Sequence, residues 1–386
     1  MGKIKNIHLI VGARPNFMKM APLYKELSLY EDKYAPLLIH TGQHYDEKMS
    51  QLFFNDLAMP KPSAYLNVGS GTQGKQTARI IERYEDLILT GDKPDLVIVA
   101  GDVNSTIACA LVAKKLQIPV AHLEAGLRSY DEQMPEEINR VLTDRISDIL
   151  LTPSLDANEN LIKEGINPEK IHFVGNIMID SLIRHQKKAE LSDIFDKLTM
   201  SQDESYALVT LHRPSNVDEC DGLKMLLTSL IEIGKHIKII FPMHPRTKKN
   251  IQNFGLSNYV NSSKNIIFTE PLGYFDFLKL EMNAKLILTD SGGVQEESTY
   301  FRVPCLTLRE NTERPITISE GTNQLVDLNV TSIVNKSLEI TEGKVKQGKI
   351  PKHWDGKTAE RVVMVLDKWF EERDKATDST ESTEKL

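Results

Sequence analysis

Residues 95–129 read DLVIVAGDVNSTIACALVAKKLQIPVAHLEAGLRS. An apolar, β-branched run at 96–100 is followed by an amphipathic stretch at 105–116 and by a second apolar run at 120–123. Strand, helix and strand in this order predict a parallel βαβ unit, with the helix covering one face of the sheet. This unit indicates the fold class, because the same alternation continues on both sides of it.

Alternating strands and helices extend over most of the chain. In the first half we predict strands at 7–11, 36–40, 96–100 and 120–123, and helices at 17–27, 77–89, 105–116 and 136–149. The pattern then restarts, with strands at 207–211, 237–241, 265–269 and 285–289 and helices at 222–235, 274–283 and 294–300. The sequence therefore predicts an α/β protein of two Rossmann-like, doubly wound domains.

The domain junction is expected within residues 176–191, where a helical stretch gives way to polar residues. We place the first domain at 1–177 and the second at 178–360. A strong helix is predicted over 358–374, and its part from 361 to 374 is treated as a separate C-terminal segment. Residues 375–386, KATDSTESTEKL, are polar throughout and are predicted to be disordered.

Length, charge and cysteine content exclude several classes of protein. A chain of 386 residues is long enough for two domains. Its net charge of −7 argues against a nucleic-acid partner, so an anionic substrate has to be met by local arginines, lysines or helix N-termini. Three widely spaced cysteines indicate neither a disulfide framework nor a zinc site. With no leader-like N-terminus and no apolar run near the ~20 residues that cross a bilayer, we expect a cytoplasmic protein that does not bind membranes.

Three carboxylates stand where a site is expected. Ligands of open α/β sheets bind at the carboxyl ends of the strands. Asp102 follows the strand at 96–100, Glu124 follows the strand at 120–123, and Glu136 opens the next helix. Crowded carboxylates disfavour each other's ionisation, which is the condition for an acid and a base in one site. Helix capping is the ordinary explanation for Asp102 and dipole pairing for Glu136, whereas Glu124 has no equally natural one.

The stretch at 290–297, DSGGVQEE, is typical of a phosphate-binding turn. A strand ends, Gly292 and Gly293 let the backbone approach a ligand, and a helix then begins with free N–H groups after Ser291. This arrangement holds a diphosphate without a dedicated cation, and Glu297, a turn further on, is placed to accept from ribose hydroxyls. An ordinary turn capped by Ser291 explains the stretch equally well.

Basic residues occupy two further strand ends. Arg14 and Lys19 lie in the first turn and helix, which match neither the GxGxxG of a nicotinamide site nor the GxxxxGK[ST] of a P-loop. His212 and Arg213 follow the strand at 207–211 and are candidates for contact with a phosphate or a leaving group. Taken singly, Arg14 and Lys19 are better explained as solvated surface groups, and a lone histidine such as His212 as a structural residue. Their repeated coincidence with strand ends is what favours a site.

Taken together, the motifs resemble those of the non-hydrolysing UDP-N-acetylglucosamine 2-epimerases. They run through nearly the whole chain in order: GARPNFMKMAP (12–22), TGQH (41–44), GDVNST (101–106), HLEAGLRS (122–129), PEEINR (135–140), VGNIMID (174–180), HR (212–213), TDSGGVQEE (289–297) and NTERPIT (311–317). The resemblance implies two Rossmann-like domains facing across a cleft in the GT-B arrangement, with the C-terminal helix packing back on the first domain. It also implies a cytoplasmic homodimer that uses neither NAD nor a metal.

The implied reaction interconverts UDP-GlcNAc and UDP-ManNAc. UDP leaves C1, a carboxylate removes the proton from C2, and the trapped 2-acetamidoglucal is reprotonated on the other face before UDP is added back. By motif position, the resemblance implies that Asp102, Glu124 and Glu136 are the acid/base residues. It does not say which of the three takes the proton. Charge developing on UDP would be stabilised by Arg14, Lys19, His212 and Arg213. The diphosphate and ribose would be held by Ser291, Gly292, Gly293 and Glu297, and uracil would stack on Tyr274, Phe275 or Phe277.

Two departures from the family pattern bear on regulation and phosphate binding. Many members read HRRE where this chain reads HRPSN at 212–216, so a second arginine is missing. Some members carry a QHREM-like stretch that is tied to activation by substrate at a second site, whereas this chain reads QHYDEKM at 43–49. The sequence therefore leaves open whether UDP-GlcNAc activates this protein.

Four alternative functions stay open. A relative that acts on UDP-2,3-diacetamido-2,3-dideoxy-glucuronate shares features of residues 41–54. A GT-B glycosyltransferase would have the same cleft but would transfer the sugar to an acceptor, without isotope exchange at C2. A hydrolysing epimerase would release free ManNAc. A nucleotide-sugar sensor is disfavoured because the carboxylate set is complete.

Overall fold

The computed structural model describes residues 3–42, 59–260, 263 and 265–383. It divides into two compact units. The first consists of Met1–Ser181 with Lys352–Leu386, and the second is Leu182–Pro351. Each unit is built on one parallel sheet, so the predicted α/β architecture of two Rossmann-like domains is confirmed.

The sheet of the first unit has seven strands in the order β3-β2-β1-β4-β5-β6-β7, and all neighbours pair in parallel. Every residue of β4 and β5 is buried, as expected for central strands covered on both faces. The strands are β1 (Lys5–Val11), β2 (Tyr34–His40), β3 (Ala64–Tyr65), β4 (Leu96–Ala100), β5 (Val120–Leu123), β6 (Ile149–Thr152) and β7 (Ile171–Phe173).

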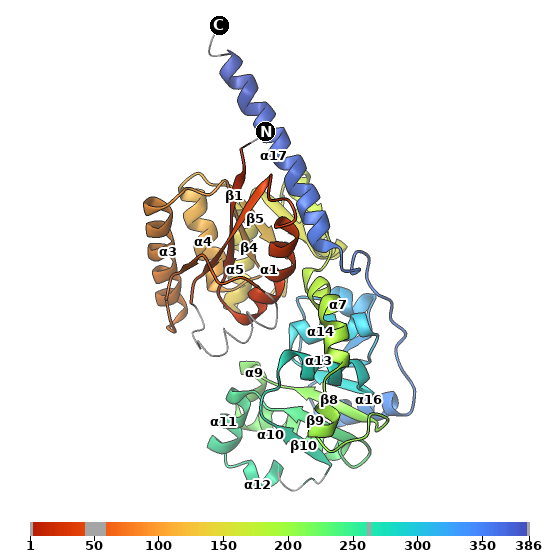
Figure 1. Ribbon diagram of the computed structural model, residues 1–386. Helices are drawn as coiled ribbons and strands as arrows, with labels where there is room; N and C mark the ends of the chain where they lie inside the picture. Colours follow the sequence, from red (N-terminus) through yellow and green to blue (C-terminus); the bar gives the residue numbers. More distant parts are fainter. Residues whose placement is uncertain (1–2, 43–58, 261–262, 264, 384–386) are drawn as a thin grey trace. The chain divides into compact units, whose positions relative to one another are not determined.

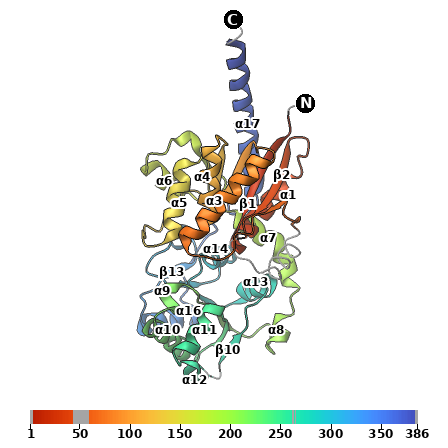
Figure 2. The same cartoon turned by 90° about the vertical axis from the view of Figure 1, so that its left-hand side faces the viewer.

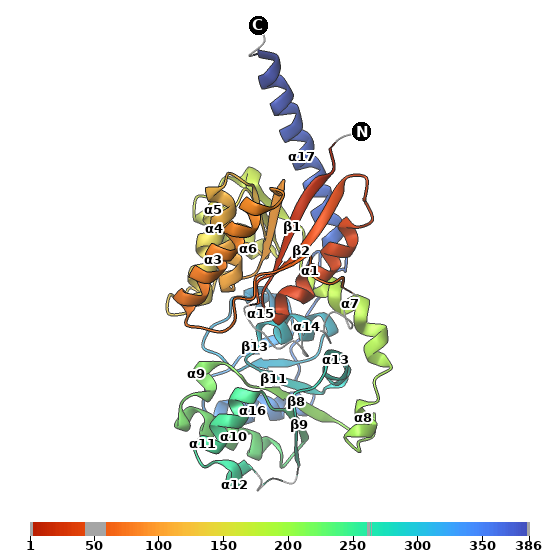
Figure 3. The same ribbon diagram turned by 60° about the vertical axis from the view of Figure 1, so that its left-hand side comes forward.

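Helices cover both faces of this sheet. Figure 3 shows α3, α4 and α5 on one side and α1 with α17 on the other. The core on the α3–α4 side contains Val97 and Val99 of β4 and the fully buried ring of Tyr84. The helices of this unit are α1 (Arg14–Leu27), α3 (Gln73–Thr90), α4 (Asn104–Lys115), α5 (Pro135–Ile146), α6 (Leu155–Lys163), the 3-10 turn Pro168–Lys170, α7 (Ile177–Glu190), which continues into the second unit, and α17 (Thr358–Thr383).

The second unit repeats the design with a six-stranded parallel sheet in the order β10-β9-β8-β11-β12-β13. Its strands are β8 (Tyr206–Thr210), β9 (Lys238–Pro242), β10 (Ile266–Thr269), β11 (Leu286–Thr289), β12 (Cys305–Thr307) and β13 (Asn323–Leu325). One apolar cluster includes residues of α10 and α16, and another includes residues of α8, α13 and α14. Figure 2 labels these helices. The helices are α8 (Ile194–Lys197), α9 (Pro214–Val217), α10 (Cys220–Ile233), α11 (Pro245–Asn253), α12 (Ser257–Val260), α13 (Tyr274–Asn283), α14 (Gly292–Phe301), α15 (Pro315–Ser319) and α16 (Val330–Thr341).

The helix predicted over 136–149 is wrong at its C-terminal end. α5 stops at Ile146, and β6 begins at Ile149. Asp148 lies in the turn between them, where its carboxylate accepts from the backbone N–H of Val120 at 2.9 Å and pairs with Lys114 at 2.8 Å. The apolar residues after this turn are buried as a strand, which an apolar run next to a helical pattern does not reveal by periodicity alone.

The C-terminal helix α17 belongs to the first unit and packs against α1 (Figure 1). Its first turn is anchored by Asp180, whose carboxylate accepts from the N–H groups of Thr358 at 3.1 Å and Ala359 at 2.8 Å. The helix runs to Thr383, past the predicted end at 374 and into the stretch predicted to be disordered. Among the residues that the structure describes, no helix is both long and apolar enough to cross a membrane.

Candidate active site

The turns that follow β4 and β5 bring carboxylates together in the first unit. β4 and β5 are neighbouring strands, so the residues after them share one sheet edge. Gly101 has a left-handed φ of 66°, and a Cβ atom there would lie 2.7 Å from Nζ of Lys19 and 3.6 Å from Oε2 of Glu124. Glycine at this position therefore allows Lys19 and Glu124 to lie against the turn that carries Asp102.

Lys19 and Glu124 form a buried ion pair. Nζ lies 2.5 Å from Oε2, and both side chains are less than a tenth exposed. Glu124 adopts a left-handed φ of 69°, which residues with a side chain rarely do. Its other oxygen, Oε1, is buried and has no hydrogen-bond partner among the described residues. Backbone strain and an unsatisfied buried oxygen are costs that proteins retain mainly at functional sites.

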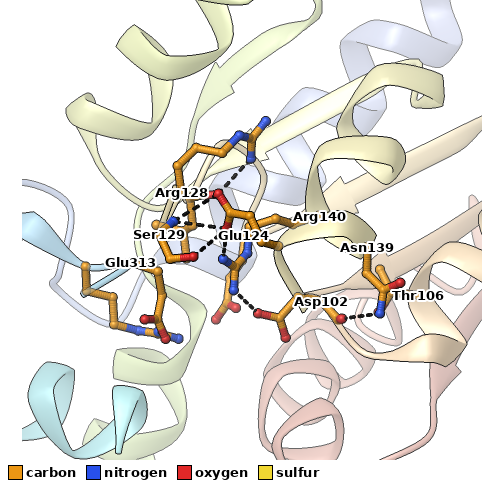
Figure 4. Close-up of polar contacts among 12 residues, drawn as sticks. Asp102, Thr106, Glu124, Arg128, Ser129, Asn139, Arg140 and Glu313 are labelled. Carbon is orange, nitrogen blue, oxygen red and sulfur yellow. Dashed lines mark hydrogen bonds and ion pairs between the residues drawn. The ribbon is translucent and has the colours of Figure 1, made fainter. Parts of the chain in front are cut away.

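Asp102 is paired with an arginine from α5. The guanidinium of Arg140, which is almost fully buried, bridges the carboxylates of Asp102 and Glu137, and Figure 4 shows it directed at Asp102. Asn139 donates to the main-chain oxygen of Asp102 at 2.8 Å. Burial raises the pKa of Glu137, but hydrogen bonds from Ser129 and the charge of Arg140 outweigh it and lower that pKa below its usual value. Glu137 thus stays anionic and holds Arg140 in place.

A cavity of about 280 Å³ opens beside Asp102 within the first unit. Asp102 and Glu136 both line it, so two of the three predicted acid/base residues face one space. The remaining lining is mostly amide and backbone, and it contains no Lys or Arg of the described residues. The lining residues are Ser70, Gly71, Gln73, Gln76, Asp102, Val103, Asn104, Pro135, Glu136 and Asn139.

The amides of this cavity form a connected network. Asn104 donates to the side-chain oxygens of Gln73 at 2.6 Å and Gln76 at 2.9 Å, and Asn139 donates to Oδ1 of Asn104 at 3.3 Å. Side chains fixed in this way cost little further ordering when a polar ligand binds. The network therefore prepares one wall of the cavity for neutral hydrogen-bonding groups.

A buried histidine, His122, contacts the turn that follows β4. Nδ1 of His122 lies 2.6 Å from Oδ1 of Asp144, and Nε2 lies 2.8 Å from the main-chain oxygen of Gly101. Asp144 also pairs with Arg128 at 2.7 Å and accepts from the N–H of Gly126 at 3.0 Å. These contacts join the turn after β4 to the turn after β5, and so fix the backbone on which Asp102 and Glu124 stand.

Part of the predicted site falls outside the described structure. The side chain of Arg14 and residues 43–49 belong to this part, so the TGQH motif is described only as far as Gly42. The roles predicted for these residues stay predictions.

In the second unit, a buried aspartate organises His212 and Arg213. Asp290 follows β11 and accepts from the N–H groups of His212 at 3.0 Å and Arg213 at 2.9 Å. Nδ1 of His212 lies 2.8 Å from Oδ1 of Asp290, while the His212 side chain is 39% exposed. Burial raises the pKa of Asp290, but its bonds and charge interaction with His212 outweigh burial and lower it. Asp290 thus orients the imidazole of His212 through Nδ1, and Nε2 points away from Asp290.

The predicted phosphate-binding turn forms as a helix N-terminus. Ser291 precedes α14 as its N-cap residue and makes no side-chain capping bond, and α14 begins at Gly292. A Cβ atom at Gly292 would collide with Nη1 of Arg314, whereas one at Gly293 would meet no atom within 4 Å. Gly292 therefore admits an arginine to the start of α14, and the uncapped N–H groups with the helix dipole favour an anion there.

Three arginines surround one glutamate near this turn. Glu313 pairs with Arg213 at 3.1 Å, with Arg309 at 2.7 Å and with Arg314 at 2.5 Å. Burial raises the pKa of Glu313, but the charges of the arginines outweigh burial and lower it well below its usual range. Arg314 also pairs with Glu296 at 2.8 Å. Three arginines against two carboxylates leave the cluster with a positive balance, which suits an anionic ligand.

Glu297 lies on α14, one turn beyond the glycines, and is 6% exposed. Among the predicted aromatic contacts, Tyr274 is buried and its hydroxyl lies 3.5 Å from Oε1 of Glu297. Phe277 packs against the core, and Phe275 lies under Nζ of Lys188 at 4.1 Å from the ring centre. Stacking of a base on any of these rings stays a prediction.

The sequence analysis did not identify the residues that hold the predicted site residues in place. Arg140 stood in the PEEINR motif, and Glu313 with Arg314 in NTERPIT, without an assigned role. The signal available was the helical spacing that puts Arg140 one turn after Glu136 and Glu137. The pairs His122–Asp144 and Arg213–Glu313 had no such signal, because their members are 22 and 100 residues apart in sequence and meet only through folding.

The described ranges contain no group of three or more His, Cys, Asp or Glu side chains that could hold a metal ion.

Comparison with known proteins gives a consistent result. The sequence model of a protein family described as UDP-N-acetylglucosamine 2-epimerase matches residues 28–367. A UDP-N-acetylglucosamine 2-epimerase of Methanocaldococcus jannaschii is 46% identical over 366 residues, which cover 93% of this chain and 98% of the relative. A UDP-2,3-diacetamido-2,3-dideoxy-D-glucuronate 2-epimerase of Pseudomonas aeruginosa is 38% identical, again over 93% of this chain and 98% of the relative.

A solved structure supports the same grouping. The crystal structure of the Methanocaldococcus jannaschii UDP-GlcNAc 2-epimerase in complex with UDP-GlcNAc and UDP aligns with a TM-score of 0.86 at 46% identity. The alignment covers 94% of this chain and 99% of that structure. Fold and sequence therefore agree over almost the full length of both chains.

Proposed function

From the premise that this chain belongs to the UDP-N-acetylglucosamine 2-epimerase family, we propose that it interconverts UDP-GlcNAc and UDP-ManNAc by inversion at C2. The observation that supports this most is the cavity of the first unit, because Asp102 and Glu136 line it and the Lys19–Glu124 pair lies against the same turn. Two opposite faces of a C2 carbon need two proton-transfer groups, and three carboxylates at one sheet edge supply them.

The proposed reaction proceeds by elimination and addition. The C1–O bond breaks with its electron pair leaving on UDP, and a carboxylate takes the proton from C2, so that a 1,2-double bond forms. Protonation of C2 on the other face and return of the UDP oxygen to C1 reverse these changes. Electrons and protons balance within substrate and side chains, so the proposed steps require neither a redox cofactor nor a metal.

Each unit has its own part in this proposal. Asp102, Glu124 and Glu136 transfer the proton at C2, and Lys19 balances the charge of Glu124. In the second unit, His212 and Arg213 stabilise the charge of departing UDP, and the N-terminus of α14 with Ser291, Gly292 and Gly293 holds the diphosphate. Glu297 accepts from the ribose hydroxyls. Preorganised charges of this kind are often the largest contribution to catalysis.

Solvent isotope exchange tests the proposed reaction. After incubation with UDP-GlcNAc in D2O, NMR is expected to show UDP-ManNAc and deuterium at C2 of both sugars. A glycosyltransferase would transfer the sugar to an acceptor without this exchange. Binding of UDP-GlcNAc with no deuterium at C2 would contradict the proposal.

A second candidate substrate is UDP-2,3-diacetamido-2,3-dideoxy-glucuronate, because a relative named for it is 38% identical. A hexuronate carboxylate favours a basic partner, and the described lining of the cavity has none. The neutral hexosamine is therefore preferred. Parallel assays with both sugars decide the matter, and a higher kcat/KM for the uronate would reverse the preference.

We also propose that the protein is a cytoplasmic homodimer. The three cysteines are free, and two of them are buried, which suits a reducing compartment. On α5, Ile138, Val141 and Leu142 are exposed at helical spacing, so the helix presents an apolar stripe on the side away from its buried residues. A second copy of this chain would cover that stripe.

Sedimentation equilibrium tests the dimer. The substitution Leu142→Asp is expected to convert a dimer to a monomer, because it places a charge in the apolar stripe. Leu89→Asp on α3 is the matched control, since Leu89 is exposed outside the stripe. Wild-type protein that sediments as a monomer, or equal effects of both substitutions, would count against this interface.

A further inference from the structure

The segment NTER at 311–314 has no role in the proposed reaction, although it belongs to one of the sequence motifs. In the second unit it is tied to α14. The hydroxyl of Thr312 donates to the side-chain oxygen of Gln295 at 2.7 Å, and Arg314 pairs with Glu296 at 2.8 Å. The same hydroxyl accepts from the backbone N–H of Arg314 at 3.1 Å. These contacts fix the segment near the start of α14.

Glu313 is the residue of this segment that contacts Arg213. Its side chain is 4% exposed, and its Oε1 accepts from Nη2 of Arg213 at 3.1 Å. The same guanidinium donates through Nε to the main-chain oxygen of Asp290 at 3.2 Å. Asp290 directly precedes Ser291, the N-cap residue of α14. The guanidinium of Arg213 is thus held between two buried acceptors next to the start of this helix.

A buried carboxylate is a costly neighbour for a diphosphate site. Its charge opposes that of the ligand, so by charge alone a neutral residue would allow tighter binding. Glu313, however, also pairs with Arg309 at 2.7 Å and with Arg314 at 2.5 Å. Burial lowers the pKa of Arg309, Glu313 raises it, and the charges of the other two arginines lower it again. The three guanidinium groups therefore repel one another, and Glu313 is the group that holds them together.

We propose that Glu313 is a positioning residue for diphosphate binding: it holds the guanidinium of Arg213 at the start of α14, ready to contact UDP. The inference rests on the proposed function, in which Arg213 stabilises the charge of departing UDP. A long arginine side chain that is fixed before the ligand arrives loses less entropy on binding. This gain exceeds the repulsion between Glu313 and the diphosphate.

Substitution of Glu313 separates positioning from charge. Glu313→Gln removes one negative charge together with the ion pair to Arg213. Charge alone would make this variant bind UDP more tightly, whereas positioning predicts about tenfold weaker binding, the range for a lost hydrogen bond to a charged group. Calorimetry with UDP and with uridine separates the phosphate contacts from those of the nucleoside, and the affinity for uridine should be unchanged. Glu310→Gln, an exposed glutamate of the same loop, is the control for the lost charge and should not weaken UDP binding.

A double-variant cycle tests whether Glu313 acts through Arg213. Arg213→Gln combined with Glu313→Gln should bind UDP no more weakly than Arg213→Gln alone, because the side chain to be positioned is gone. Losses that add up would overturn the inference. Glu313→Asp serves if the Gln variant does not fold, since it keeps a carboxylate beside the buried arginines and shortens its reach. It should also weaken the binding of UDP and not that of uridine.

The outcomes keep this inference distinct from the proposed function. If Glu313→Gln binds UDP as tightly as wild-type protein or more tightly, the positioning role is overturned while the proposed reaction stands. If Arg213→Gln leaves the affinity for UDP unchanged, the Arg213 contact fails and the inference with it, whatever the result of the deuterium exchange. If both variants lose affinity but wild-type protein exchanges no deuterium, the reaction is contradicted and the positioning role stands.

Discussion

The first unit gathers carboxylates at its sheet edge, whereas the second gathers arginines. In the first unit two cations face three carboxylates, with Lys19 paired with Glu124 and Arg140 shared between Asp102 and Glu137. In the second unit a single glutamate, Glu313, is shared by three arginines. The same parallel α/β design thus carries an excess of carboxylates at this site of one unit and an excess of arginines at the corresponding site of the other.

Under the proposed function, this difference divides two chemical tasks between two units of the same fold. Carboxylates that transfer protons have to be held in place and still be able to change their protonation state, so a small number of cations is suitable. A diphosphate carries a constant negative charge, so its site benefits from an excess of arginine and from a helix N-terminus. Substitutions in the two units should therefore affect turnover and nucleotide affinity separately.

The largest effect is expected for the carboxylates of the first unit. Asp102→Asn, Glu124→Gln and Glu136→Gln should each lower kcat by about 10²–10⁴-fold, because each removes a proton-transfer group. Affinity for UDP, measured by calorimetry, should change little. Glu132→Gln in the exposed loop before α5 is the control and should behave as wild type. Near-normal turnover in all three variants would mean that other residues transfer the proton.

The second unit should show the reverse pattern with a smaller effect. Arg213→Gln is expected to weaken UDP binding by about 10- to 100-fold, the range for lost hydrogen bonds to charged groups. Deuterium exchange at saturating substrate should persist. Arg246→Gln, an exposed arginine paired with Asp218, is the matched control. Equal losses of affinity in both variants would indicate a general charge effect and would erase the distinction between the units.

Acid is expected to destabilise the first unit. Between the two pKa values of a buried histidine, the unfolding equilibrium constant should rise by about tenfold for each pH unit that is lost. Burial lowers the pKa of His8, on β1 of the first unit, to about 4, below the value of about 6.5 in an unfolded chain. The folded state thus disfavours the protonated imidazole, so this stability is complete above pH 6.5 and is lost as the pH falls toward 4. His40, on β2, has a pKa lowered to about 4 by burial, and its Nδ1 accepts from the N–H of Gly42 at 2.8 Å.

Urea unfolding between pH 7.5 and 4.5 measures this dependence. His8→Leu should show a shallower fall of the unfolding free energy with decreasing pH, whatever its stability at neutral pH. His236→Leu, at an exposed position of the second unit, should keep the wild-type slope. Hydrogen exchange at pH 5 should increase first in β1 and β2, and an earlier increase in β8 or β11 would show that acid acts on the other unit.

Much of the fold and of the site could be predicted from the sequence, because both depend on local pattern. The bounds of β4 and β5 and of α13 agree with the predicted ranges, since each has a regular apolar pattern with clear ends. Short strands such as β7, β12 and β13 were missed, because three residues do not establish a period. The rule that ligands bind at the carboxyl ends of strands singles out Asp102 and Glu124, and the strands that precede them, β4 and β5, are neighbours in the sheet.

The sequence by itself determined the order of strands and helices, the family and the identity of the residues at the strand ends. Only the tertiary structure decided the partners of those residues: Lys19 for Glu124, Arg140 for Asp102 and Glu313 for Arg213. Periodicity and motif spacing are set over a few neighbouring residues. Burial, charge balance and the position of a proton depend on groups that are distant in sequence, and these meet only when the sheets and helices pack.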